Sequence, residues 1–137
     1  EIDLMKVEIE NNSKSNVFFI EEDLKIMLSY KLNVNHDSVT TSIHLNSGGA
    51  KVFCTGEDSK KLEKGLYSAT YVIPKSLLNN SFYTVDVFLI FNVTEIKCSK
   101  QDVVSFSMEE KNKRTEYLGE VAGVVRPIIT SNNQRIA

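Results

Sequence analysis

Few residues in this chain are suited to chemistry, and none of them forms a recognised catalytic motif. The two histidines, His36 and His44, lie eight positions apart, with no cysteine or carboxylate at metal-ligand spacing. The patterns G-x-x-x-x-G-K-[ST], G-x-G-x-x-G and G-x-S-x-G are all absent. We therefore expect no catalytic residue, no metal and no cofactor. An enzyme would need carboxylates such as Asp86 and Glu116 to converge in a cleft.

Asp86 is the most informative polar residue because it interrupts an apolar run. A carboxylate in the middle of a strand needs a partner, such as a basic side chain or a bound hydroxyl-rich ligand. The alternative is that it points to solvent from the outer face. His44 lies on the outward side of another expected strand, where it is either a binding residue or an ordinary surface histidine.

If the strands that carry these residues are neighbours, their outward side chains form a polar face dotted with aromatic rings. Sugars bind such faces, because their C–H groups pack on rings while their hydroxyls bridge to carboxylates, amides and imidazoles. The candidate carbohydrate-binding residues are Ser42, His44, Lys51, Phe53, Thr84, Asp86 and Phe88, and Thr40 lies on the same expected face. Asp86→Ala and His44→Ala are expected to weaken glycan binding with little change in melting temperature.

Hydrophobic and polar residues alternate along most of the chain, which is typical of half-buried strands. The expected strands are residues 4–9, 24–32, 39–45, 50–55, 66–73, 82–91, 103–108 and 124–130. Turn-forming segments such as Ser47-Gly48-Gly49 separate them, and short helical turns are possible near residues 59–63 and 74–78. About eight short strands at this spacing predict an all-β sandwich.

Two further local features concern Tyr67 and the connection that follows residue 109. Tyr67 is either a corner tyrosine, with its hydroxyl bonded back to the loop before the strand, or an ordinary core residue. The connection of residues 109–123 is long and charged, and Gly119 and Gly123 lie near its end. A terminal strand on such a hinge is the usual element for exchange between protomers.

The size and composition of the chain predict one globular domain of residues 1–137. A net charge of -2 argues against nucleic-acid binding, and no run of 18 apolar residues occurs. The chain starts at Glu1 without a leader, so we expect it to be excised from a longer one. Cys54 and Cys98 are expected to be free thiols, and chance accounts for the Asn-x-Ser/Thr triplets at residues 11, 79 and 92.

The order of the strand segments resembles that of a known family. The segments are an N-terminal strand, then Asp23-Leu24-Lys25-Ile26-Met27-Leu28-Ser29-Tyr30, Leu62-Glu63-Lys64-Gly65-Leu66-Tyr67, Tyr83-Thr84-Val85-Asp86-Val87-Phe88-Leu89, Asp102-Val103-Val104-Ser105-Phe106-Ser107-Met108, and the tail Gly119-x-x-x-Gly123-Val124-Val125-Arg126-Pro127. In this order they resemble the C-terminal carbohydrate-binding domain of the ATP-binding subunit of bacterial O-antigen polysaccharide ABC transporters, the Wzt type.

The resemblance implies an immunoglobulin-like antiparallel β-sandwich of about eight strands. It implies a non-catalytic module that recognises the end of a lipid-linked O-antigen polysaccharide at the cytoplasmic face of the bacterial inner membrane. A nucleotide-binding domain would lie upstream, the transporter membrane subunit would be a partner of the full-length protein, and a homodimer would exchange the C-terminal strand. The chain has no Trp, so Phe53, Phe88 or Tyr117 would stack on the sugar. The alternative is a secreted or cell-surface sandwich that binds protein. The Asn-x-Ser/Thr triplets, as glycosylation sites, and a Cys54–Cys98 disulfide would favour this alternative.

Overall fold

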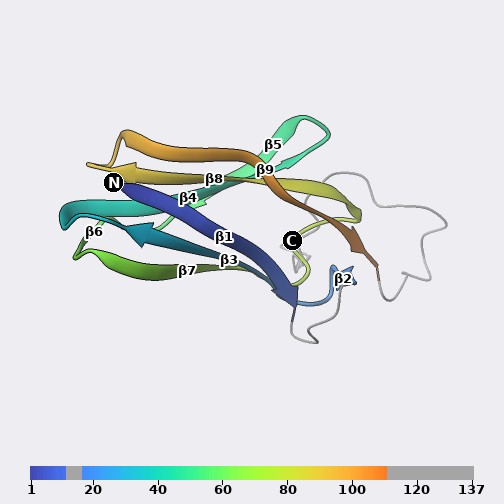
Figure 1. Ribbon diagram of the computed structural model, residues 1–137. Helices are drawn as coiled ribbons and strands as arrows, with labels where there is room; N and C mark the ends of the chain where they lie inside the picture. Colours follow the sequence, from blue (N-terminus) through green and yellow to red (C-terminus); the bar gives the residue numbers. More distant parts are fainter. Residues whose placement is uncertain (12–16, 111–137) are drawn as a thin grey trace, which may run out of the picture.

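The described part of the chain forms nine strands in two sheets that lie face to face (Figure 1). The structure is a computed structural model, and it describes residues 1–11 and 17–110. In chain order the strands are β1 (Ile2–Asn11), β2 (Phe18–Phe19), β3 (Leu24–Leu32), β4 (His36–Ser47), β5 (Ala50–Gly56), β6 (Lys60–Leu62), β7 (Gly65–Ile73), β8 (Ser81–Phe91) and β9 (Glu95–Glu109).

The smaller sheet has the order β1-β3-β7, and the larger sheet has the order β2-β9-β8-β4-β5, with β6 also paired to β4. Neighbouring strands are antiparallel except for β2 and β9, which pair in parallel over two residues each. This order, with β1, β3 and β7 in one sheet and β9, β8 and β4 adjacent in the other, is that of an immunoglobulin-like sandwich. The predicted all-β sandwich is therefore confirmed.

The core lies between the sheets, and two central strands supply half of it. Along β3 and β8 every second side chain points inward, and the residues between them point to the outer faces. The buried residues of these two strands are Leu24, Ile26, Leu28, Tyr30, Leu32, Tyr83, Val85, Val87, Leu89 and Phe91. Full burial of a large apolar side chain contributes about 1.5–3 kcal/mol, so these two strands fix the position of the outward residues that alternate with them.

Two tyrosines bond back to the loops that precede their strands. Tyr67 Oη donates to the carbonyl oxygen of Glu63 at 2.6 Å, which confirms the corner tyrosine among the two alternatives for this residue. Tyr83 Oη makes the same bond, over the same four-residue separation, to the carbonyl oxygen of Asn79 at 2.7 Å. Tyr83 stands near the start of β8, which is the strand that carries the tyrosine corner of immunoglobulin-like domains.

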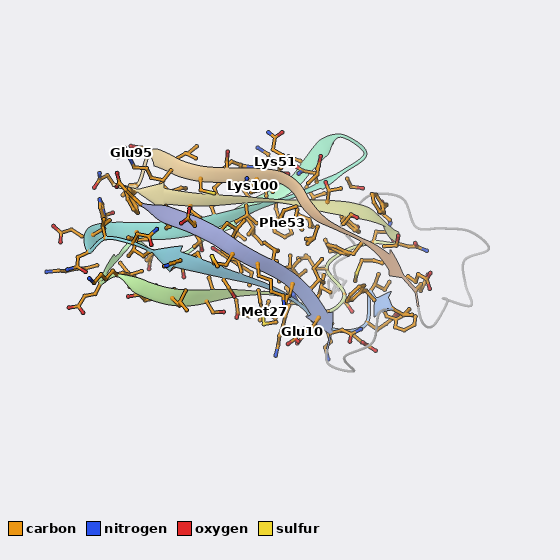
Figure 2. All side chains as sticks on the ribbon, in the orientation of Figure 1. Glu10, Met27, Lys51, Phe53, Glu95 and Lys100 are labelled. Carbon is orange, nitrogen blue, oxygen red and sulfur yellow. The ribbon has the colours of Figure 1, made fainter. Side chains whose placement is uncertain are left out.

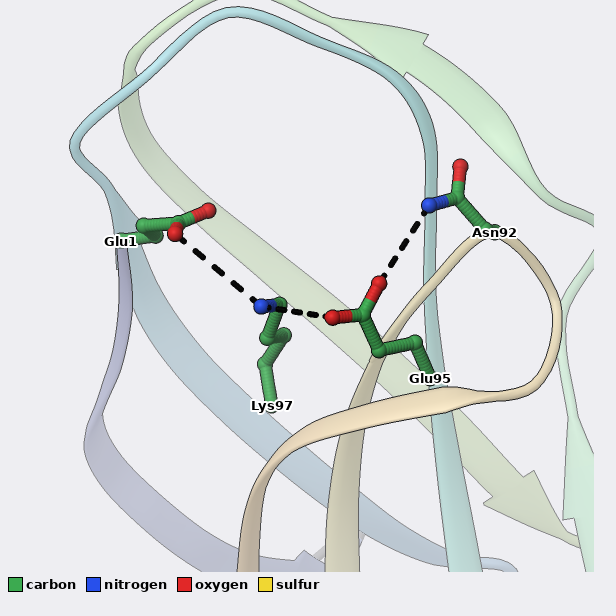
Figure 3. A network of polar contacts seen from close by, with 4 residues as sticks. All are labelled: Glu1, Asn92, Glu95 and Lys97. Carbon is green, nitrogen blue, oxygen red and sulfur yellow. Dashed lines mark hydrogen bonds and ion pairs between the residues drawn. The ribbon is translucent and has the colours of Figure 1, made fainter.

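A polar network joins the start of β1 to the β8–β9 hairpin (Figure 3). Lys97 Nζ lies 2.7 Å from Glu95 Oε1 and 4.0 Å from Glu1 Oε1, and Asn92 Nδ2 donates to Glu95 Oε2 at 3.4 Å. The hydrogen bond from Lys97 is the main cause that lowers the pKa of Glu95. Exposed ion pairs stabilise a fold only slightly, so this network adds little to the stability of the sandwich.

Three sequence-based expectations differ from the structure or lie outside it. The helical turn near residues 59–63 is wrong, because this segment forms β6 by pairing with β4. Residues 74–78 form a turn without a helix. The expected strand at 124–130, together with Glu116, Tyr117 and the glycines of the hinge, lies outside the described residues.

Both cysteines are free, as expected: Cys54 is exposed on β5, and Cys98 is half-buried on β9. The segments 1–11 and 17–110 contain no helix that is long and apolar enough to cross a membrane.

Candidate functional site

The register of the larger sheet brings most of the predicted site residues together on its outer face. In β4 and β8, His44 stands opposite Asp86, Ser42 opposite Phe88, and Asn46 opposite Thr84. Residues directly opposite each other on antiparallel strands point to the same side of the sheet. The five predicted residues on these two strands, Ser42, His44, Thr84, Asp86 and Phe88, therefore share one face, which we call the outer face.

Lys51 joins this face from β5, whereas Phe53 does not. Lys51 pairs with Asn46, but Phe53 pairs with Leu45, whose side chain is buried. Val52 is an extra residue between the two pairs, and such a bulge reverses the alternation of the strand beyond it. The predicted outward position of Phe53 is therefore wrong (Figure 2): its side chain packs against the core.

The bulge has two further consequences for the expected face. Phe53 lines an apolar groove of about 470 Å³ between the sheets, with Tyr71 and Leu77 on the opposite wall. Cys54 takes the outward position beside His44. The position of Thr40, which was also expected on the outer face, does not depend on this bulge: Thr40 is buried, and its hydroxyl donates to the carbonyl oxygen of Glu57 at 2.6 Å.

Asp86 has partners on both neighbouring strands. Its Oδ2 accepts a hydrogen bond from Asn46 Nδ2 at 3.0 Å, and its Oδ1 accepts one from the backbone N–H of Asp102 at 2.9 Å. The expected need for a partner is therefore met within the protein, by a side-chain amide and a backbone N–H in place of a basic side chain. Each carboxylate oxygen can accept a second hydrogen bond, so Asp86 keeps acceptor sites for a ligand.

A polar hollow of about 530 Å³ opens beside this carboxylate. Its wall comes from the β4–β5 turn, from the outward residues of β8 and from β9. The lining residues are Asn46, Ser47, Gly48, Gly49, Phe82, Thr84, Asp86, Gln101 and Asp102. The glycines at the turn both have positive φ angles of 59° and 78°, which suit glycine and let the chain reverse tightly at the rim.

Three aromatic rings lie near Asp86 on the outer face: Phe82 lines the hollow, whereas His44 and Phe88 lie outside its lining. The rings of His44 and Phe88 lie with their centroids 4.4 Å apart at an interplanar angle of 43°. Burial lowers the pKa of His44 most, the positive charge of Lys51 lowers it further, and the charge of Asp86 opposes both. His44 is therefore neutral at pH 7, so that its imidazole offers one donor and one acceptor. Phe82 precedes Asp86 along β8, whereas Phe88 follows it, and the side chain of Phe82 is 55% exposed.

Seven of the nine residues that line the hollow were not among the predicted site residues, and three of these, Ser47, Gly48 and Gly49, were expected only as a turn. Asn46 and Phe82 continue the outward alternation of His44 and Thr84, so the pattern that found the others could have found them. Gln101 and Asp102 gave no such signal, because they belong to an irregular part of β9 where pairing with β8 is interrupted.

The described residues thus form an immunoglobulin-like sandwich with a polar hollow on the outer face of its larger sheet. Among solved structures, this fold is shared by the crystal structure of the C-terminal domain of Wzt, with a TM-score of 0.72. The superposition covers 98% of this chain and 84% of that chain at 12% sequence identity. No protein-family model and no curated protein matches the sequence. At this identity the likeness establishes the fold, and with it the fold that the resemblance implied.

Proposed function

We propose that the domain is a non-catalytic carbohydrate-binding module and that the hollow on its outer face holds the sugar. The observation that supports this most is the meeting of a carboxylate, an amide and a hydroxyl in one hollow: Asp86, Asn46 and Thr84. Sugar hydroxyls are both donors and acceptors, and such a group of side chains can pair with several of them at once.

Two aromatic rings, the half-buried Phe88 and the exposed Phe82, supply the apolar part of the site. The C–H face of a sugar ring packs on an aromatic ring, and such contacts exclude water beside the hydrogen bonds. Phe88 on one side and Phe82 on the other take this role in a chain without Trp. A volume of about 530 Å³ lies within the range of roughly 300–1,000 Å³ that is typical of small-ligand sites, which suits a mono- or disaccharide unit better than a long stretch of polymer.

The proposed ligand in the cell is the end of a lipid-linked O-antigen polysaccharide, which the module selects for export by an ABC transporter. Two findings support this: the order of strand segments in the sequence, and the fold shared with the C-terminal domain of Wzt. In this proposal a nucleotide-binding domain lies upstream, and the transporter membrane subunit is its partner at the cytoplasmic face of the inner membrane. The proposed homodimer, with an exchanged C-terminal strand, involves residues outside the described part of the chain.

The alternative of a secreted adhesion domain has less support from the structure. It relied on glycosylation triplets and a disulfide, but Asn11 and Asn79 are both buried and the two cysteines are free. Only the triplet at Asn92 has an exposed asparagine.

Calorimetric titration of the protein with purified O-polysaccharides that differ at their non-reducing ends tests the proposal. We expect one of them to bind, and we expect His44→Ala and Phe88→Ala each to weaken binding about fivefold by removing a ring contact of about 1 kcal/mol. Thr70→Ala, on the exposed outer face of the smaller sheet, is the matched control and should bind like the wild type. Equal weakening by the control variant would contradict the assigned face, and release of new reducing ends during incubation would contradict a non-catalytic role.

A further inference from the structure

The pairing of β8 with β9 is interrupted next to the hollow. Val85 pairs with Val104 and Val87 pairs with Lys100, so that the three residues from Gln101 to Val103 stand opposite Asp86 alone. A regular antiparallel ladder sets one residue against one. The strand β9 therefore carries two extra residues at this point, and we call the segment Gln101–Val103 the β9 bulge.

Asp86 holds this bulge in place. The backbone N–H of Asp102, which has no ladder partner in this stretch, donates to Asp86 Oδ1 at 2.9 Å. Asp102 has a φ angle of 50°, in the left-handed region that costs most residues about 1–2 kcal/mol but that Asp and Asn tolerate better. Such a conformation persists only where the surroundings fix it, and the hydrogen bond to Asp86 is a contact that can do so.

The two walls of the hollow differ in how firmly the core fixes them. Thr84 and Asp86 alternate with Val85 and Val87, which are buried, so the positions of the first two follow from the packing of β8. Gln101 and Asp102 are exposed and line the hollow without a buried neighbour on either side in the bulge. Bulges beside binding sites are known to re-aim side chains.

We propose that Gln101 and Asp102 determine which sugar the hollow accepts, and that Asp86 acts on this choice as a positioning residue for the β9 bulge. This rests on the proposed function and deepens it. The constant part of the site, on β4 and β8, supplies general affinity for hydroxyl-rich ligands. The bulge supplies the side chains that distinguish the orientation of one hydroxyl from another.

Selectivity is measured with the methyl α-glycosides of mannose, galactose, glucose and N-acetylglucosamine, each titrated into ¹⁵N-labelled protein and followed by amide chemical shifts. Gln101→Ala and Asp102→Asn should change the ratio of dissociation constants between the best and the second-best glycoside by about tenfold, the effect of one hydrogen bond to the sugar. Asparagine adopts the left-handed conformation as readily as aspartate, so Asp102→Asn keeps the bulge. Thr70→Ala should leave the ratio unchanged.

The positioning role is read from the amide of Asp102 in the protein without ligand. In Asp86→Asn the new side chain has one acceptor oxygen for two donors, so we expect the Asp102 amide proton to shift upfield and to exchange with solvent faster. The selectivity ratio should move in the same direction as in Asp102→Asn. Asn46→Ala is the control, because it removes the other partner of Asp86 and should leave the Asp102 amide unchanged.

The outcomes separate the two proposals. Binding of a glycoside with the same ratio in wild type, Gln101→Ala and Asp102→Asn overturns the selectivity assignment and leaves the proposed function in place. An Asp102 amide that is unchanged in Asp86→Asn overturns the positioning role. If no glycoside or polysaccharide binds the wild-type protein, the proposed function fails and the selectivity assignment fails with it.

Discussion

Replacing Asp86 by alanine should destabilise the fold as well as weaken binding, because the carboxylate links β8 to both of its neighbours. The change removes the bonds to Asn46 Nδ2 and to the backbone N–H of Asp102. Hydrogen bonds to charged groups contribute about 1.5–3 kcal/mol when buried. Asp86 is half-exposed and water replaces part of each bond, so we take about 1 kcal/mol for each of them, or about 2 kcal/mol in total.

For a chain of this length a loss of 1 kcal/mol lowers the melting temperature by roughly 3–4 °C. Asp86→Ala should therefore melt roughly 7 °C below the wild type in a calorimetric scan at pH 7. In urea the midpoint should fall with an unchanged slope, because the folded and unfolded states keep their exposed areas. This differs from the expectation drawn from the sequence, in which Asp86→Ala changes the melting temperature little.

Two variants serve as references for this measurement. Asn46→Ala removes only one of the two bonds and should lose about half as much stability as Asp86→Ala. His44→Ala loses a contact between two surface rings and should fall by less than either. A decrease below about 2 °C for Asp86→Ala, or equal decreases in all three variants, would refute the reasoning that the carboxylate joins β4, β8 and β9.

Three other predictions concern the core and the thiols. Tyr83→Phe should lower the free energy of unfolding by about 1–3 kcal/mol, because the Tyr83 hydroxyl makes its hydrogen bond in the buried core. Tyr67→Phe removes the same kind of bond at the surface and should lower it by less than about 1 kcal/mol. Equal losses of stability in urea unfolding would contradict the role of burial. Burial raises the pKa of Tyr30 and of Tyr83 to about 12, above the value of 10.0 that applies to an unfolded chain. The unfolded state then loses these protons first, so stability should be unaffected by these groups below pH 10 and should fall as the pH rises from 10 to 12; a urea midpoint that stays constant over this range would contradict the assignment. Cys54 is exposed and Cys98 is half-buried, so a thiol reagent should label Cys98→Ser faster than Cys54→Ser, and equal rates would show that the thiol of Cys98 is as accessible as that of Cys54.

Strands whose two faces differ in environment were predictable from the sequence. The alternation of residues 24–32 gave β3 with its bounds, and that of residues 82–91 gave β8 to within one residue, because one face of each is buried and the other is solvated. The first half of β9 was missed because it is exposed on both sides and carries no alternation. β6 was missed for a different reason: its three residues are strand only through pairing with β4.

The candidate site was predictable as far as the strands are regular. Ser42, His44, Thr84, Asp86 and Phe88 follow from alternation on β4 and β8, and the register confirms that they share one face. Phe53 was misplaced because one extra residue, Val52, reverses the alternation of β5. A bulge depends on the pairing of two strands, and the residues of one strand alone do not reveal it.

The number of extra residues in each bulge decides which changes of length the sheet tolerates. Because β9 carries two of them, the side chains of Val104 and Lys100, where pairing resumes and where it stops, point to the same face of the sheet. Phe106 and Met108 therefore remain in the core. Insertions or deletions of two residues here would reshape the wall of the hollow and preserve the sandwich, whereas a change of one would turn the following core residues to solvent. A library that varies this segment in steps of two should thus yield hollows of different shape on an unchanged scaffold.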